Sequence, residues 1–423
     1  MVQQLADRTY GIAGFRGAVH RPGGEGYERG RAALSPAVDA RPVLVAEASG
    51  REDVRAAVAA AGELGLPLAV QATGHGTHVP SDGGILLRTT ALDRVEIDPI
   101  RRVARVGPGA RWGQVLAAAA PYGLAPLSGS SPDVGVTGFT LGGGVGWLSR
   151  RYGFAADSVL SAEVVTADAR IVTADAHRDA DLFWALRGGG GNFGMVTSLE
   201  FRLYPVAEVF AGIAFFPYER AGETLARYRD WAASAPDEVS TAIMLTKGPD
   251  GGRAVGIKAM YAGPAERGRQ VLRPLWEAAG PALADGVRPV PYARAAMGGT
   301  PARYLDLFPS LPDELIGALV ETGREATVEL RHWGGAMAQA GPDAGPVGHR
   351  GLPFSIIVDQ ALPGLSERLG QHGIGGTFLN FLADSTRVRD AYTETDYRRL
   401  AAVKRCYDPG NVFRLNHNIV PQG

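Results

Sequence analysis

The stretch that decides the fold is Leu66-Pro67-Leu68-Ala69-Val70-Gln71-Ala72-Thr73-Gly74-His75-Gly76-Thr77-His78. Its apolar run 66–70 predicts a buried strand, and the loop that follows places His75 between two glycines. Gly74 and Gly76 let the backbone approach a ligand closely, because glycine has no Cβ. A neutral imidazole is also a nucleophile near physiological pH. The loop therefore indicates a tightly held cofactor, for which a covalent bond to His75 is one means of attachment.

The segments around this loop predict a β-α-β unit followed by hairpins. A strand at 42–46 leads into a helix that ends near Gly65, and Ser49 with Glu52 forms a predicted capping box at its start. Further strands are predicted at 84–88, 94–98, 103–106, 162–166, 169–172 and 196–203, further helices at 112–120 and 179–186, and a helix and turn at 29–41.

The hydrophobic pattern of the sequence changes after Pro205, where long amphipathic segments begin to alternate with apolar strands. This pattern predicts an α+β fold in which residues 206–375 form a second part with an antiparallel sheet flanked by helices. The predicted helices are 219–234, 264–279 and 312–325, the predicted strands are 241–246, 254–260 and 327–333, and a last helix is predicted at 386–405.

The composition is that of an ordinary soluble protein. The 423 residues are 45% hydrophobic and 21% charged, with a net charge of −1, so neither nucleic acid nor an anionic membrane is indicated as a partner. Cys406 is the one cysteine, which excludes an intrachain disulfide. No signal peptide and no run of about 20 apolar residues is recognisable, so a cytoplasmic protein is expected.

Two glycine clusters require separate interpretations. Residues 189–194 match G-x-G-x-x-G, but a predicted helix precedes them and a strand follows, which is the inverse of the Rossmann order. Residues 128–147 offer many backbone N–H groups, which suits a pyrophosphate or a flat ring system. Close packing through glycines is the alternative. His75 and His78 are three residues apart, yet no other histidine or cysteine has ligand spacing, so no metal site is expected.

Several motifs together resemble FAD-linked oxidases of the berberine bridge enzyme-like group, within the vanillyl-alcohol oxidase and p-cresol methylhydroxylase superfamily. They are Thr73-Gly74-His75, the stretch 128–146, Arg151 to Asp157, Asp181 to Arg187 before four glycines, and the tail 407–419. The resemblance implies a two-part FAD-binding domain of the p-cresol methylhydroxylase type, formed by residues 1–205 with 376–423 returning to it. Residues 206–375 would form the substrate-binding domain.

The resemblance also implies that FAD is the cofactor and that His75 bonds to the flavin 8α-methyl carbon. Many members add a second bond from a cysteine at the position that Ser131 occupies here, so a single histidyl link is predicted. The residues expected to bind FAD are Thr73, Gly74, His75, Gly76, Thr77, His78, Ser128, Gly129, Ser130, Ser131, Val134, Gly135, Gly138, Phe139, Leu141, Gly142, Gly143, Gly144, Gly146, Trp147, Tyr152, Gly153, Asp157, Val164, Gly191, Asn192, Phe193, Gly194, Val196, Asn416 and Asn418.

The reaction that the resemblance implies is oxidation of a small-molecule specialised metabolite, by alcohol dehydrogenation or oxidative cyclisation. Electrons would pass to FAD and then to dioxygen, which yields hydrogen peroxide. The alternatives are a flavin-dependent monooxygenase, a dehydrogenase with another electron acceptor, and a flavoprotein that binds without catalysis. A monomer and a homodimer are both compatible with the sequence.

The catalytic base is the point at which this chain departs from the family. Many members that oxidise alcohols have a Tyr-x-Asn motif, whereas this chain has Phe378-Leu379-Asn380, and a phenylalanine cannot accept a proton. The candidates are Tyr152, and Glu329 with Arg331 on one face of a predicted strand. A glutamate with a raised pKa in an apolar pocket could act as the base, and Arg331 could bind an anionic substrate or enolate.

A surface ion pair is the alternative interpretation of Glu329 and Arg331. His332, on the opposite face of that strand, and His349 are weaker candidates. In the tail, Asn416 and Asn418 are expected to lie near the flavin or to position the C-terminal segment, with His417 between them pointing away.

Overall fold

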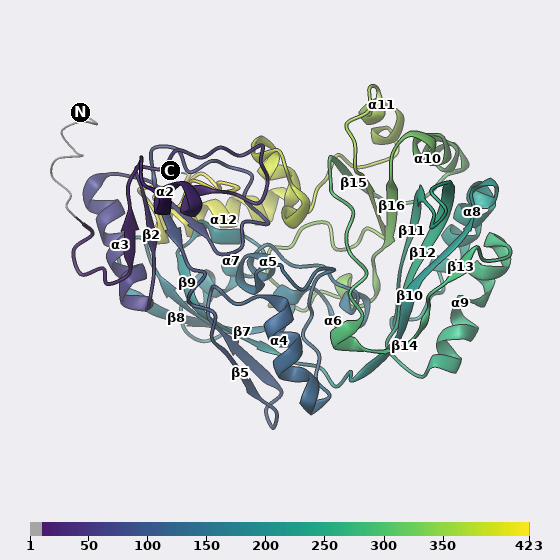
Figure 1. Cartoon of the computed structure of the whole chain (residues 1–423), viewed down its shortest axis with the longest axis horizontal. Helices are drawn as coiled ribbons and strands as arrows, with labels where there is room; N and C mark the ends of the chain where they lie inside the picture. Colours follow the sequence, from purple (N-terminus) through teal and green to yellow (C-terminus); the bar gives the residue numbers. More distant parts are fainter. Residues whose placement is uncertain (1–10, 423) are drawn as a thin grey trace.

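The computed structural model describes residues 11–422, which form three β-sheets with helices packed on them (Figure 1). Residues 1–10, on which the expected absence of a signal peptide partly rests, lie outside the described residues. Two sheets are built from strands that precede residue 205, and the third is built from residues 208–358. The fold is α+β, as the sequence predicts.

The first sheet contains the predicted β-α-β unit. Its elements are β1 (Ala18–His20), β2 (Leu44–Glu47), α3 (Arg51–Leu64), β3 (Leu68–Gln71) and β4 (Ile85–Arg88). β2 and β3 both pair in parallel with β4, and α3 connects them with Val54 and Val58 buried. The helix ends at Gly65, whose φ of 64° is a left-handed conformation that glycine adopts without steric cost.

Two predictions before α3 are wrong. In the helix and turn predicted at 29–41, the helix is placed too late: it is α2 (Glu25–Arg31), and Pro36, which lacks a backbone N–H, opposes a helix through the later residues. The capping box at Ser49 is also absent. Asp53 accepts hydrogen bonds from the Ser49 N–H (2.8 Å) and hydroxyl (2.6 Å), so a carboxylate inside the helix holds this turn.

The second sheet is antiparallel and carries the main core of the first part of the chain. Its strands are β5 (Val95–Asp98), β6 (Val103–Val106), β7 (Val159–Val165), β8 (Ile171–Asp175) and β9 (Met195–Arg202), and its core also includes side chains of α4 (Trp112–Ala119) and α7 (Ala180–Leu186). The glycine run 189–194 lies between α7 and β9. The order helix, glycines, strand is therefore confirmed, and it is not a Rossmann order.

The third sheet is the predicted antiparallel sheet. Its strands are β10 (Glu208–Pro217), β11 (Val239–Lys247), β12 (Arg253–Tyr261), β13 (Ala284–Asp285), β14 (Arg288–Pro291), β15 (Tyr304–Phe308), β16 (Val328–His332) and β17 (Phe354–Val358). The helices α8 (Ala221–Ala232), α9 (Ala265–Ala279) and α10 (Asp313–Glu325) cover its outer face (Figure 1). The opposite face packs on Trp147 and Leu148, so this sheet contacts residues 128–147, called the glycine-rich segment below.

The C-terminal helix differs from its prediction over 386–405. The structure has a 3-10 helix at Ser385–Ala391 and then α12 (Glu394–Tyr407). Thr393 separates them, because its hydroxyl accepts a hydrogen bond from the Asp396 N–H (3.1 Å) and caps a new helix. α12 packs beside α7, so the chain end returns to its first part (Figure 1).

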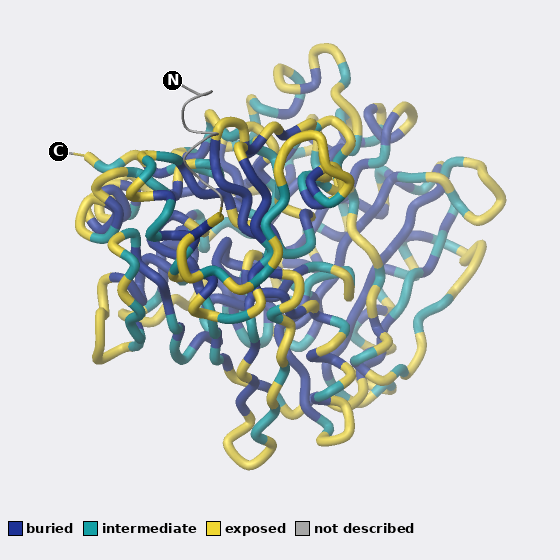
Figure 2. Tube along the Cα trace, turned by 60° about the vertical axis from the view of Figure 1, so that its left-hand side comes forward, coloured by how far each residue is buried: buried dark blue, intermediate teal, exposed yellow. Residues whose placement is uncertain are grey.

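Short elements complete the fold, and the sheet strands are largely buried while the surface loops are exposed (Figure 2). The remaining helices are α5 (Val136–Leu141), α6 (Ser149–Tyr152) and α11 (Leu365–Gly370), with 3-10 helices at 120–122, 155–158, 190–192, 218–220, 292–294, 335–337 and 379–381. Within residues 11–422, no helix has both the length and the apolar character needed to cross a membrane. The domain boundaries at 205 and 375 stay a prediction.

Candidate functional site

The His75 loop follows β3 and contacts the segment that contains Gly135. A Cβ on Gly135 would lie 3.4 Å from the Thr73 hydroxyl oxygen. The pKa of His75 is lowered mainly by desolvation, with Asp133 raising it and Arg111 lowering it. A lowered pKa keeps the imidazole neutral at physiological pH, which is its nucleophilic form. The structure therefore places an exposed, neutral imidazole beside the glycine-rich segment.

The glycines of the predicted site fall into two groups. A Cβ on Gly76 or Gly138 would meet no atom within 4 Å, so these backbones face open space. A Cβ on Gly129 or Gly144 would press against the Phe139 ring, so there the need for glycine comes from packing inside the protein. Close packing therefore accounts for Gly129 and Gly144, and contact of the open glycines with a cofactor stays a prediction.

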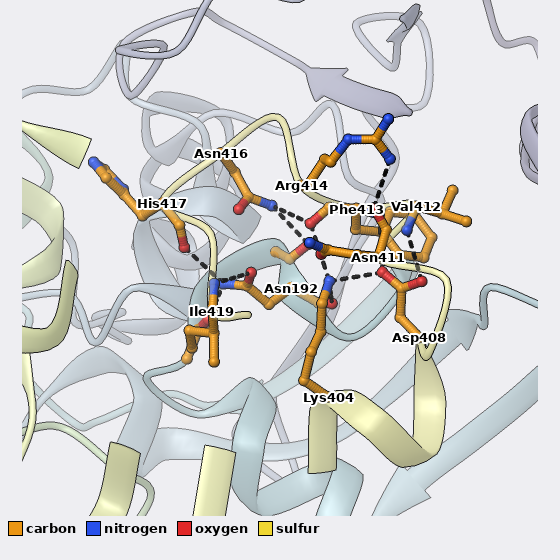
Figure 3. Close-up of polar contacts among 12 residues, drawn as sticks. Asn192, Lys404, Asp408, Asn411, Val412, Phe413, Arg414, Asn416, His417 and Ile419 are labelled. Atoms are coloured by element: carbon orange, nitrogen blue, oxygen red, sulfur yellow. Dashed lines mark hydrogen bonds and ion pairs between the residues drawn. The ribbon is translucent and has the colours of Figure 1, made fainter. Parts of the chain in front are cut away.

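The tail is fixed on the glycine run through Asn192 (Figure 3). The Asn192 side-chain N–H groups donate to the backbone oxygens of Gly189 (2.9 Å) and His417 (3.0 Å), and its oxygen accepts from the Ile419 N–H (2.9 Å). All these bonds are internal to the protein. The Asn192 side chain thus holds the tail in place, and a direct role in binding FAD stays a prediction.

A buried ion pair supports the same junction (Figure 3). Lys404 and Asp408 are fully buried, and the Lys404 ammonium lies 2.6 Å from the Asp408 carboxylate. The ammonium also donates to the backbone oxygens of Asn192 (2.7 Å) and Phe413 (3.1 Å). The Asp408 carboxylate accepts from the N–H groups of Val412 (2.7 Å) and Phe413 (2.9 Å). The Lys404–Asp408 pair therefore fixes the backbone at the start of the tail, at Val412 and Phe413.

Several buried side-chain oxygens, in these motifs or shortly after the His75 loop, have no partner among the described residues. They are Ser81 Oγ, Thr137 Oγ1, Thr140 Oγ1, Asn416 Oδ1 and Asn418 Oδ1. Buried polar atoms normally form hydrogen bonds, because leaving them unpaired costs free energy. FAD carries hydroxyl groups and a ring N–H that could satisfy such acceptors. The open glycines and these oxygens together fit that cofactor.

His417 links the tail to the His75 loop. Its ring lies 5.7 Å from the His78 ring, and its Nε2 is 2.8 Å from the Leu382 oxygen. Burial lowers the pKa of His417 to about 4, and the hydrogen bond to Leu382 opposes this shift. The ring is therefore neutral at physiological pH and donates to the carbonyl.

On the substrate side, Glu329 and Arg331 share one face of β16, as the sequence predicts. Glu329 is fully buried and pairs with Arg331 on one oxygen and with Lys258 (3.2 Å) on the other, where Thr300 also donates. Burial raises its pKa, but Arg331 and Lys258 together bring it down to about 2. The expectation of a raised pKa is therefore wrong, and so is the alternative of a surface ion pair. Two adjacent cations stabilise this buried carboxylate.

The other face of β16 carries Leu330 and His332. His332 lies among aromatic rings, and its Nε2 is 3.1 Å from an Arg150 terminal nitrogen. Burial and the Arg150 charge lower the pKa of His332 to about 3. Arg150 also donates to the Val239 carbonyl (2.8 Å). Arg150 therefore joins α6 to β11 and β16 of the third sheet, which is a structural role.

Tyr152 is the last residue of α6, and this helix lies between the first part of the chain and the third sheet (Figure 1). Its ring stacks on Tyr204 with centroids 4.1 Å apart, and the Arg151 guanidinium lies 5.2 Å from it. Burial raises the pKa of Tyr152, so the phenol is protonated at neutral pH. Nearby, Asp157 forms a two-point ion pair with Arg350 (2.7 and 2.9 Å).

Phe378 and Asn380 occupy the positions of the family's Tyr-x-Asn motif. Phe378 is buried in an aromatic cluster with Phe154, 5.6 Å between ring centroids. Asn380 accepts from the Gly144 N–H (2.9 Å) and donates to the Phe139 carbonyl (3.0 Å). Asn380 therefore holds the glycine segment in place, whereas Phe378 supplies no proton acceptor.

The remaining predicted residues divide between the core and the glycine segment. Val164 pairs with Val196 across β7 and β9, and both lie in the main core. Leu141, Phe193 and Gly194 also support this core, since a Cβ on Gly194 would collide with Val164. Their contact with FAD stays a prediction.

Sequence reasoning missed Lys258, Thr300 and Tyr292. Lys258 had a signal, because it is the one charged residue in the apolar run 254–261. Tyr292 had none. Its hydroxyl lies 3.0 Å from the Ser128 hydroxyl and donates to the Pro126 carbonyl, which ties the glycine-rich segment to the third sheet.

Known proteins share both the motifs and the fold. A family model described as an FAD binding domain matches residues 42–175, and one described as berberine and berberine like matches residues 377–420. (R)-6-hydroxynicotine oxidase from Paenarthrobacter nicotinovorans is 31% identical over 424 residues, covering 90% of this chain and 92% of that protein. This chain belongs to the berberine bridge enzyme-like family.

Solved structures agree with this assignment. The structure of 6-hydroxy-D-nicotine oxidase from Arthrobacter nicotinovorans has a TM-score of 0.85 at 25% identity and covers 98% of this chain and 100% of its own. Glucooligosaccharide oxidase from Acremonium strictum, described with a 6-S-cysteinyl, 8α-N1-histidyl FAD, has the same fold, with a TM-score of 0.80 at 24% identity and coverage of 96% and 98%. This berberine bridge enzyme-like protein is an FAD-linked oxidoreductase.

Proposed function

We propose that the protein is an oxidase that carries FAD on His75 and oxidises a small-molecule specialised metabolite. The reaction is dehydrogenation of an alcohol or oxidative cyclisation, and dioxygen then takes the electrons and becomes hydrogen peroxide. The exposed, neutral imidazole of His75 on a glycine loop is the observation that carries the proposal. The similarity to a protein named an oxidase, over 90% of this chain, supports it.

A single covalent bond to the flavin is part of the proposal. Ser131 stands where many family members have the second, cysteinyl link, and a hydroxyl is a far weaker nucleophile than a thiolate. Cys406 is exposed on α12, outside the glycine-rich segment. His75 alone is therefore the proposed attachment.

FAD, when bound, supplies the redox chemistry by accepting two electrons from the substrate. The protein side chains orient the substrate. Tyr152, a phenol with a raised pKa, stays protonated and donates a hydrogen bond to a substrate oxygen. Glu329 stays ionised and acts as a positioning residue, because it binds the Nε–H of Arg331.

Aerobic reoxidation of the flavin tests the oxidase function. The purified protein is first reduced anaerobically with a panel of alcohols, sugars and cyclic amines, and bleaching of the flavin absorbance identifies a substrate. On mixing with air-saturated buffer, we expect full reoxidation within seconds and one hydrogen peroxide per flavin. Reoxidation over many minutes would instead assign the protein to the dehydrogenases.

Tyr152→Phe tests the role of the phenol. With the bleaching substrate, we expect kcat to fall roughly 10²-fold with little change in KM, because the hydrogen bond to the reacting oxygen is lost. Tyr204→Phe is the matched control, since Tyr204 is the stacking partner and its hydroxyl has no assigned role. Equal losses in both variants would contradict a catalytic role for Tyr152.

A further inference from the structure

The Arg331 guanidinium lies where three parts of the chain meet. It extends from β16 of the third sheet and lies over the Trp147 ring (5.8 Å) and the Phe381 ring (5.5 Å). Trp147 belongs to the glycine-rich segment and Phe381 to the C-terminal segment, both of which carry the family's FAD motifs. The guanidinium therefore borders the proposed flavin site.

Only one corner of this guanidinium is paired. Its Nε donates to Glu329, and no described residue accepts a hydrogen bond from either terminal nitrogen. The side chain is only 10% exposed, yet neither terminal nitrogen is completely enclosed. Nine-tenths burial normally requires that a charged group find partners. The two terminal nitrogens of Arg331 thus keep N–H groups that no described residue binds, and part of their surface is exposed.

The cluster carries one positive charge too many. Lys258 and Arg331 are both cations, and Glu329 is the one carboxylate between them. Lys258 donates also to the Gly298 carbonyl (3.2 Å), which is neutral. The aromatic faces beside Arg331 attract a cation but do not neutralise it. A ligand with one negative charge would therefore complete this cluster.

Strand pairing in the third sheet brings the charged residues of this cluster together. Ala242 on β11 pairs with Lys258 on one side and with Arg331 on the other. Its small side chain leaves room on this face for Glu329 to reach both cations. The three charges are thus fixed to two strands, β12 and β16, on either side of β11, and side chains are held more precisely on strands than on loops.

We propose that Arg331 is the recognition site for a carboxylate of the substrate, so that the oxidised metabolite is a carboxylic acid with an aromatic or otherwise apolar body. The flat fork of a guanidinium matches the two oxygens of a carboxylate, and Trp147 and Phe381 provide apolar walls beside it. Glu329 positions the fork and limits the excess charge to one. This inference rests on the proposed function, since it places the substrate beside the flavin.

Benzoate binding to the flavin-loaded protein tests the inference. Benzamide is the neutral analogue of the same shape, and 4-nitrophenolate is an anion without a carboxylate. We expect benzoate to perturb the flavin absorption spectrum and to raise the melting temperature, with an affinity at least tenfold above those of both analogues. Equal binding of benzoate and benzamide would overturn the proposal, and so would a preference for 4-nitrophenolate.

Variants at Arg331 and at Glu329 are expected to change benzoate affinity in opposite directions. Arg331→Met is expected to weaken benzoate binding about 10- to 100-fold, and Arg331→Lys, which keeps the charge without the fork, about tenfold. Glu329→Gln adds one net positive charge and is expected to strengthen it severalfold. Arg273→Met removes a guanidinium that is 73% exposed on α9 and is expected to have no effect. Unchanged binding in Arg331→Met and Arg331→Lys would overturn the proposal.

The same samples separate this inference from the proposed function. Flavin content and aerobic reoxidation are recorded for each preparation before benzoate is added. A wild-type protein that reoxidises rapidly but fails to prefer benzoate overturns the carboxylate site alone. A protein that contains flavin but reoxidises slowly overturns the oxidase, while the benzoate melting shift still decides the carboxylate site.

Discussion

Replacing His75 with alanine is expected to abolish covalent attachment of the flavin completely. The wild-type protein should stay yellow after precipitation in trichloroacetic acid, because a carbon–nitrogen bond survives denaturation. The His75→Ala precipitate should be colourless, with all FAD in the supernatant. His75 is the neutral, exposed nucleophile of the loop, and Ser131 supplies no second thiolate bond. Absorbance of pellet and supernatant near 450 nm measures the outcome.

Two matched variants show whether the effect belongs to His75. His78→Ala removes an imidazole three residues further along the same loop, and Ser131→Ala removes the hydroxyl at the position of the second link. Both precipitates should stay yellow. Colour that persists in the His75→Ala pellet would place the bond elsewhere, and a colourless wild-type pellet would contradict a covalent flavin altogether.

Local sequence signals predict most of the fold because they act over few residues. Helical spacing locates α9 and α10 to within a residue or two, and the inverted context of residues 189–194 excludes a Rossmann unit. The errors at two helix starts come from side-chain hydrogen bonds, which the spacing of apolar residues does not reveal. Asp53 holds the Ser49 turn from inside the helix, and the Thr393 cap divides a segment whose periodicity continues across it.

The candidate site is predicted less completely because it depends on contacts between distant strands. Alternation along β16 places Glu329 and Arg331 on one face, but only the strand register brings Lys258 across Ala242 to the same carboxylate. Arg331 and this second cation together lower the pKa of Glu329, whereas a raised pKa was expected. Likewise, the tail motif indicates a family, whereas the partners of Lys404 come from residues up to 212 positions away.

Lys404→Met is expected to lower the free energy of unfolding by about 3–5 kcal/mol. Methionine fills a similar volume but removes an ammonium that serves Asp408 and two backbone carbonyls. The Asp408 carboxylate would stay buried without its counter-ion, at a point where the tail joins residues 189–194. Guanidinium denaturation followed by tryptophan fluorescence measures the loss, and the flavin spectrum reports whether the tail still closes on the site.

The control lies on the same helix. Arg398 pairs with Glu394 on the surface of α12, 70% exposed, so Arg398→Met should change stability by no more than about 0.5 kcal/mol. Adding Asp408→Asn to Lys404→Met removes the uncompensated charge and should recover at least ~1 kcal/mol, since residues of one ion pair are coupled. If the double variant is as unstable as the sum of its two single variants, the charge pair is not what holds the tail. The loss would then come from packing of the Lys404 stem alone.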